Sequence, residues 1–149
     1  MKGLHANLNQ YTKSGSAPIK AAARGENTIG VAFLHGVVKQ AVSGFPVDGV
    51  APCEGTGYEI GSMSIIDGAR NVDEAKMFYD WALSAKAQSE AWKVKSFQVP
   101  SNVSAESSPL APDPASINLI DYDFKLYGSS AERKRLLKKW DDEVSVLPQ

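Results

Sequence analysis

The chain has 149 residues, which is enough for one domain with a hydrophobic core. Its 43% hydrophobic and 22% charged residues are typical of a globular protein, and a net charge of −1 gives no reason to expect nucleic acid as a partner. No apolar run approaches the roughly 20 residues of a membrane-spanning helix, and a single cysteine, Cys53, excludes an internal disulfide.

The first segment, residues 1–13, is predicted to be helical because Leu4, Leu8 and Tyr11 recur at helical spacing. Its first ten residues, MKGLHANLNQ, contain no apolar stretch of the kind found in secretory signals. The sequence therefore predicts that this chain, as given, carries no signal peptide.

Residues 14–33 are predicted to form a loop, a helix, a tight turn and a strand. Ser16 is a favourable N-cap, Pro18 suits the first helical turn, and Gly25 suits the left-handed residue that ends a helix. The apolar run TIGVAF at residues 28–33 then predicts a short buried strand. The loop Ser14-Gly15-Ser16 would present backbone N–H groups and hydroxyls to an anion. The alternative is an ordinary N-cap with nothing bound.

The middle of the chain alternates between helix and strand signals. Residues 35–43 are predicted to form a short helix or turn that Gly44 ends. Residues 47–51 and 58–66 are predicted strands, separated by the loop PCEGTG at residues 52–57.

The last part of the chain is predicted to be helical. Asn71 and Glu74 form a capping box before a helix whose buried face comprises Ala75, Phe78, Tyr79 and Ala82. Ser84 is predicted to cap a second helix at residues 85–93, and residues 101–116 to form a surface connection. Ser129 and Glu132 predict a further capping box, and the final helix carries an apolar stripe formed by Leu136, Leu137, Trp140 and Val144.

Three stretches carry a family resemblance: YTKSGSAP, ARGENTIGVAFLH and PCEGTGYEIGSMSIIDGARNVDEAKMFYDWALSAKAQ. In this order and spacing, from about residue 7 to residue 144, the chain resembles the C-terminal half of bacterial ABC-transporter substrate-binding proteins. The nearest subgroup is the iron(III)-type or sugar-phosphate-like one. The resemblance implies an α/β fold, namely a partial type II periplasmic-binding-protein fold with a short mixed sheet flanked by helices and a helical C-terminus. It also implies one domain, residues 1–149, that is a fragment of a two-lobed protein. Residues 1–56 would belong to the second lobe, and residues 57–149 would form a crossover strand and the C-terminal helices.

The function that this resemblance implies is binding of a small polar anion, such as a sugar phosphate, for an ABC importer. The protein would not be an enzyme and would hold no cofactor and no metal. The intact relatives are periplasmic and deliver ligand to a membrane permease. Without a signal peptide, this chain as given would be cytoplasmic or an isolated piece of a longer protein. The ligand-binding residues would be Ser14, Gly15, Ser16, His35, Glu59, Glu54 and Thr56.

The residues at 33–36 separate two ligand classes. Ferric-binding relatives carry two adjacent tyrosines at about this place, whose oxygens suit a hard cation. This chain has Phe33, Leu34, His35 and Gly36 instead, which disfavours ferric ion as the ligand. Some relatives have an aspartate where this chain has Gly36, so one acceptor for a sugar hydroxyl is absent.

Ferric-ion binding stays open as an alternative although these residues disfavour it, and two other functions also remain open from the sequence. In one, the chain is a ligand-free interaction fragment, and its unpaired sheet edges make it a homodimer. In the other, it is a hydrolase that uses His35 with Glu54 or Glu59, although no nucleophile–base motif supports that chemistry.

Overall fold

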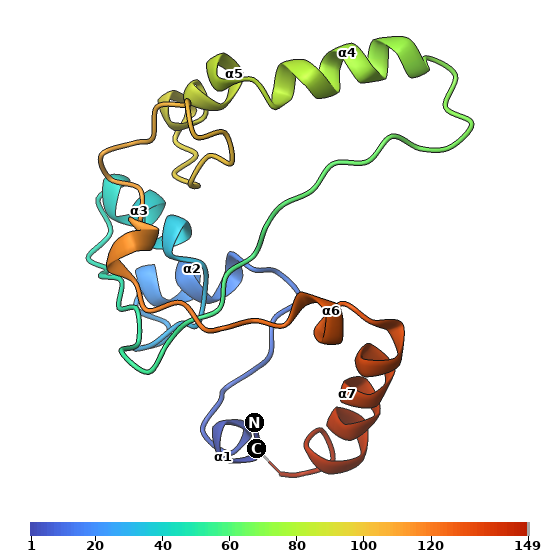
Figure 1. The fold of residues 1–149 in the computed structure, drawn as a ribbon. Coiled ribbons are helices and arrows are strands. Elements are labelled where there is room, and N and C mark those ends of the chain that lie inside the picture. The colour runs from blue at the N-terminus through green and yellow to red at the C-terminus, as the bar shows by residue number, and fades with distance from the viewer. Residues whose placement is uncertain (149) are drawn as a thin grey trace. The chain divides into compact units, whose positions relative to one another are not determined.

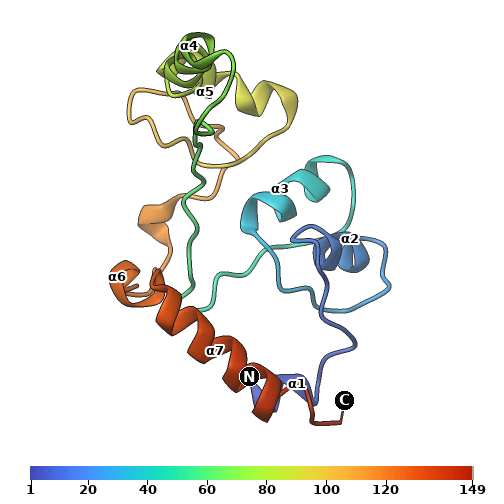
Figure 2. The same cartoon turned by 90° about the vertical axis from the view of Figure 1, so that its right-hand side faces the viewer.

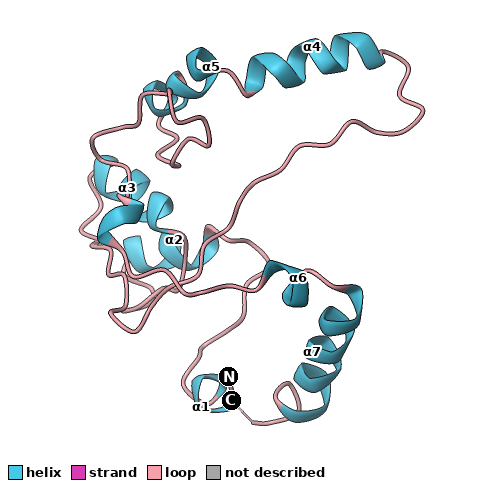
Figure 3. Cartoon of the chain, viewed as in Figure 1, coloured by secondary structure: helices cyan, strands magenta, loops and turns pink. Residues whose placement is uncertain are grey.

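A computed structural model of the chain describes residues 1–148 (Figure 1). Helices and loops make up the described part of the chain, and no strand is drawn there (Figure 3). None of the described helices is long and apolar enough to cross a membrane. The elements, in order, are α1 (Lys2–His5), α2 (Ala17–Ala23), α3 (Leu34–Val42), α4 (Val72–Ala82), α5 (Ala85–Ser89), the 3₁₀ turns η1 (Ala91–Val94) and η2 (Pro114–Ser116), α6 (Phe124–Tyr127) and α7 (Ser130–Glu143).

The chain divides into two compact units, each described here by itself. The first unit combines Met1–Lys13 with Ile120–Gln149, and the second unit is Ser14–Leu119. Figure 2 shows the second unit as the part that contains α2, α3, α4 and α5. The division near residue 56 that the sequence suggested stays a prediction.

Helices α2 and α3 pack on each other in the second unit, and α2 buries Ile19, Ala21 and Ala23. Both end in the way predicted, since Gly25 and Gly44 have φ values of +73° and +90°. The Glu26 N–H donates to the Ala21 carbonyl over 2.9 Å, which is the bond that closes a Schellman motif. Ile19 is 5% exposed, and a side chain at Gly36 of α3 would lie 3.5 Å from it. Local helix signals and one apolar contact therefore set this part of the fold.

The predicted sheet is not confirmed. Residues 28–33, 47–51 and 58–66 run as extended or irregular chain, and the isolated bridge that is found joins Thr56 to Leu119 in parallel. Ile29 and Val31, predicted to be buried in a strand, are 81% and 77% exposed. The physical reason is that a strand is completed by hydrogen bonds to a neighbour. These segments have the composition of strands but no neighbouring strand among residues 1–148.

Of the four predicted N-caps, Ser84 and Ser129 make the capping hydrogen bond, whereas Asn71 and Ser16 do not. The Ser84 and Ser129 hydroxyls accept hydrogen bonds from the N–H groups of the third helical residues, over 3.2 Å in each case. Asn71 stands at the N-cap of α4 as predicted, but its side chain makes no capping bond. The predicted buried face of α4 is wrong, since no residue of α4 is buried: Ala75, Tyr79 and Ala82 are half-buried and Phe78 is exposed.

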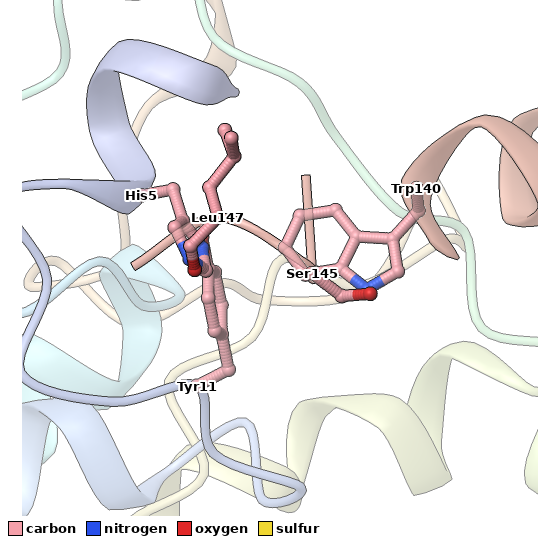
Figure 4. Close-up of a pocket in the computed structure, with 5 residues that line it drawn as sticks. All are labelled: His5, Tyr11, Trp140, Ser145 and Leu147. Carbon is pink, nitrogen blue, oxygen red and sulfur yellow. The ribbon is translucent and has the colours of Figure 1, made fainter. Parts of the chain in front are cut away.

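The first unit departs from its prediction at the N-terminus, since α1 ends at His5 and residues 6–13 are not helical. His5 is buried, and its Nδ1 lies 3.1 Å from the Tyr11 hydroxyl and its Nε2 2.9 Å from the Leu147 carbonyl oxygen. Trp140 of α7 meets Tyr11 edge to face with ring centroids 4.9 Å apart (Figure 4). This aromatic cluster joins the two ends of the chain. Val144 is buried, whereas Leu136 and Leu137 of the predicted stripe are exposed.

Candidate functional site

The loop Ser14-Gly15-Ser16, called the serine loop below, leads into α2 in the second unit. The Ser14 Oγ lies 3.3 Å from the Ser16 Oγ and accepts a 3.4 Å hydrogen bond from the Ser16 N–H. Ser16 is the N-cap as predicted, but its side chain makes no capping hydrogen bond, so that part of the prediction is wrong. The two hydroxyls instead face each other on an exposed turn.

Phe33 connects the serine loop to His35. A side chain at Gly15 would lie 3.0 Å from Phe33 Cε2, so the loop backbone rests on the edge of this ring. The Phe33 and His35 rings stack, with centroids 5.5 Å apart and planes 18° from parallel. Sequence reasoning did not single out Phe33. Two sequence features could have indicated a role for Phe33. It is an aromatic residue two positions before His35, and the serine loop has a glycine at its centre that lets a ring approach the backbone.

His35 is the second residue of α3 and is half-buried. Burial is the main cause that lowers the pKa of His35 below its ordinary value of 6.5, and the charge of Lys39 one turn later lowers it further. The carboxylate of Glu59 opposes both effects, so Glu59 lies within electrostatic range of the ring. At neutral pH the imidazole is therefore neutral and offers one donor and one acceptor. The serine loop, Phe33, His35 and Glu59 are called the His35 group below.

Glu54 and Thr56 are held differently, in a loop fastened by Asn118. The Asn118 Nδ2 donates to the Cys53 carbonyl and the Thr56 N–H donates to the Asn118 carbonyl, each over 2.9 Å. The pKa of Glu54 is lowered by its own backbone N–H and then by the Cys53 thiol, which donates to Oε2 over 3.4 Å. Glu59 thus acts on His35 through its charge, whereas Glu54 bonds to Cys53, and Thr56 bonds to Asn118 and bridges Leu119.

The residues of the His35 group are exposed, apart from the half-buried His35. One hollow of about 360 Å³ lies in the first unit (Figure 4). Another, of about 240 Å³, lies in the second unit. None of the predicted ligand residues lines either one. Within residues 1–148, no group of three or more His, Cys, Asp or Glu side chains could hold a metal ion. The two hollows are lined by His5, Tyr11, Trp140, Ser145 and Leu147, and by Ile65, Lys76, Tyr79 and Asp80.

Known proteins resemble this chain over almost all of its length. An uncharacterized protein of Haemophilus influenzae is 52% identical over 147 residues, which are 98% of this chain and 42% of that protein. The periplasmic binding protein AfuA from Actinobacillus pleuropneumoniae, whose structure contains exogenous fructose-6-phosphate, is 53% identical with a TM-score of 0.92. The alignment covers 98% of this chain and 46% of AfuA.

A second solved structure is also similar to this chain. The periplasmic binding protein P5PA is 39% identical with a TM-score of 0.88, over 97% of this chain and 46% of that protein. No family model matches the chain. The predicted resemblance to a sugar-phosphate-like periplasmic binding protein is confirmed, and the chain spans about half the length of the relatives it matches.

Proposed function

We propose that this chain is a non-enzymatic, solute-binding part of an ABC importer, and that it binds a sugar phosphate. The observation that carries the proposal is the similarity to AfuA, which was solved with fructose-6-phosphate bound and matches 98% of this chain at a TM-score of 0.92. The same relatives favour a periplasmic location for the whole protein and delivery of its ligand to a membrane permease.

In the proposed mechanism, the serine loop receives the phosphate. The hydroxyls of Ser14 and Ser16 are close together and exposed, and hydrogen bonds to an anion are stronger than those between neutral groups. The stacked Phe33 ring supports the loop from behind and leaves its outer side open to ligand. The phosphate would thus be bound by uncharged donors that the fold already holds together.

His35 and Glu59 would bind the hydroxyl groups of the sugar. A neutral imidazole donates one hydrogen bond and accepts another, and a carboxylate accepts hydrogen bonds from hydroxyls. Glu54 and Thr56 form a second set of candidate contacts to the ligand, on the loop that hydrogen bonds to Asn118 hold in place. When such a ligand is bound by two lobes at once, it favours the closed state because its affinity for that state is higher.

The test is thermal unfolding and calorimetric titration of the purified chain with fructose-6-phosphate, inorganic phosphate, fructose and ferric citrate. A ligand that binds only the folded chain raises the midpoint of unfolding. We expect a rise with the sugar phosphate and a smaller one with phosphate. Combined Ser14→Ala and Ser16→Ala substitutions should remove both rises, whereas His35→Gln should remove the preference for the sugar phosphate.

The matched control is Ser107→Ala, which removes an exposed hydroxyl outside the candidate site and should leave every rise unchanged. Equal rises with fructose and fructose-6-phosphate would contradict the assignment of the serine loop to phosphate. A rise in the unfolding midpoint with ferric citrate alone would show that the ligand is ferric ion and not a sugar phosphate.

A second candidate function is that of a ligand-free fragment that forms a homodimer. The observation in its favour is the number of large apolar side chains that stay exposed in the second unit, including Ile29, Val31 and Val50. Light scattering at several concentrations tests it, because a dimer that binds none of the four compounds would support this function over solute binding.

A further inference from the structure

The Phe33 side chain touches two parts of the candidate site that are distant in sequence. On one side, a side chain at Gly15 would lie 3.0 Å from Phe33 Cε2 and 3.5 Å from Cδ2, so the centre of the serine loop rests on one edge of the ring. On the other side, the ring stacks on that of His35, with centroids 5.5 Å apart. One rigid ring therefore contacts both the loop proposed for the phosphate and the histidine proposed for the sugar.

The backbone of Phe33 is held in place, whereas its ring has room to turn. Phe33 is the N-cap of α3, with extended backbone angles (φ −76°, ψ 136°), and its carbonyl accepts from the Gly36 N–H over 2.9 Å. The segment before it lies against α2, because a side chain at Gly30 would come within 2.6 Å of the Pro18 carbonyl oxygen. The Phe33 side chain is 45% exposed. A change in the serine loop would therefore move the ring rather than the backbone.

A movement of this ring would reach His35 through the stack. The two planes are 18° from parallel, and a phenyl ring pivots as one unit, so displacing its Cε2 edge tilts the face that His35 packs on. The charges of Glu59 and Lys39 also act on the histidine, but charge interactions do not fix the angle of a ring as stacking does.

We infer that Phe33 is a positioning residue that couples the serine loop to His35, so that a phosphate on the loop helps to orient the histidine for the sugar. Phe33 has no polar side-chain atom and cannot itself form a hydrogen bond to the ligand through its ring substituents. Because such coupling is reciprocal, it would favour a ligand that carries phosphate and sugar together over either part alone. The ligand in this inference rests on the proposed function, but the coupling is a property of the ligand-free chain and can be measured there.

The first experiment follows the His35 ring protons of the ligand-free chain by nuclear magnetic resonance. The chain has two histidines, and His35→Gln assigns the resonances. Gly15→Ala places a methyl group 3.0 Å from Phe33 Cε2, which is tight enough that the ring must give by a few tenths of an ångström. We therefore expect Gly15→Ala to shift the His35 resonances, although residues 15 and 35 do not touch through the new methyl group.

The same substitution in a chain without the ring makes the test specific. In a Phe33→Leu background, Gly15→Ala should leave the His35 resonances nearly unchanged, because leucine is shorter and carries no stacked ring. In a Phe33→Tyr background the response should return. This double-mutant comparison separates coupling through the ring from a general loss of structure. Circular dichroism checks that each variant is folded, and Phe33→Met replaces Phe33→Leu if the latter does not fold.

The second experiment measures affinity by calorimetric titration with fructose-6-phosphate and inorganic phosphate. Phe33→Leu should weaken binding of fructose-6-phosphate by roughly two- to tenfold, the size that an aromatic pair contributes, and binding of phosphate by less. The matched control is Phe45→Leu. Phe45 is 40% exposed and belongs to the same unit, but it lies outside the His35 group, so the control should change neither affinity.

Three results would overturn the inference. The first is no shift of the His35 resonances in Gly15→Ala. The second is an equal shift with and without the Phe33 ring. The third is equal weakening of fructose-6-phosphate binding by Phe33→Leu and Phe45→Leu. If the unaltered chain binds neither compound, the proposed function is contradicted, and the ligand-free resonances still decide whether Phe33 couples the loop to His35.

Discussion

The segment with α2 and α3, residues 17–44, and the extended residues 58–66 belong to the same unit, but they bury their apolar side chains differently. In the first, Ile19, Ala21 and Ala23 are buried between neighbouring parts of the chain. In the second, Ile60 and Ile66 remain largely exposed. Both segments contain enough apolar residues to build a core.

The difference lies in where each segment finds its hydrogen bonds. A helix satisfies its backbone hydrogen bonds within itself, so α2 and α3 need only one packed face. An extended segment satisfies its backbone through a neighbouring strand, and residues 58–66 have no neighbouring strand within the described chain. The apolar residues of such a segment therefore stay exposed where no partner strand is formed within residues 1–148.

The largest expected effect is on the free energy of unfolding, and it should differ between two isoleucines. Ile19→Ala should lower the free energy of unfolding by about 2–5 kcal/mol, since it empties a buried contact between α2 and α3. Ile60→Ala should change it by no more than about 0.5 kcal/mol, because that side chain is already exposed. Chemical denaturation followed by circular dichroism measures both. Equal losses would show that residues 58–66 pack within this chain.

The next largest effect on stability should differ between two glycines. Gly30→Ala should destabilise the chain by about 1–3 kcal/mol, because the new methyl group would meet the Pro18 carbonyl at 2.6 Å and force the backbone apart. Gly61→Ala adds a methyl group with nothing within 4 Å and should alter stability by about 0.5 kcal/mol or less. The same denaturation series applies, and a neutral Gly30→Ala would show that residues 28–33 do not rest on α2.

A smaller effect concerns the start of α2. Ser16→Ala should change stability by less than about 0.5 kcal/mol, because its hydroxyl makes no capping bond. The control is Ser84→Ala at α5, where the hydroxyl accepts from the Ala87 N–H, and it should cost about 1 kcal/mol. If Ser16→Ala is the more costly of the two, the serine loop caps α2 after all and is less available to ligand.

The smallest effect is the dependence of stability on pH at His35. Its pKa is lower in the folded chain than the ordinary value of 6.5, so the unfolded chain binds more protons between those two values. Stability should therefore fall as the pH drops from about 6.5 to the folded pKa, and level off below it. His35→Gln should remove this part of the pH dependence.

Nuclear magnetic resonance titration of the His35 ring gives the sharper measurement. Lys39→Gln should raise the pKa of His35 and Glu59→Gln should lower it further, because the two charges act in opposite directions. If the pKa of His35 is unchanged in Glu59→Gln, then the Glu59 carboxylate does not act on the His35 ring.

Much of the local structure was predictable from the sequence. The ends of α2 and α3 at Gly25 and Gly44, and the caps at Ser84 and Ser129, follow from short-range chemistry that needs no distant contact. The resemblance to periplasmic binding proteins was also readable in the order of a few short stretches, and the comparisons confirm it.

The rest was decided by tertiary structure. The sequence could not show that Phe33 would lie between the serine loop and His35, or that Glu59 rather than Glu54 would act on that ring. It also predicted strands at residues 28–33 and 58–66 that are not formed within residues 1–148. Helix ends depend on neighbours along the chain, whereas strands, stacked rings and charge pairs depend on neighbours in space, and only the folded molecule supplies those.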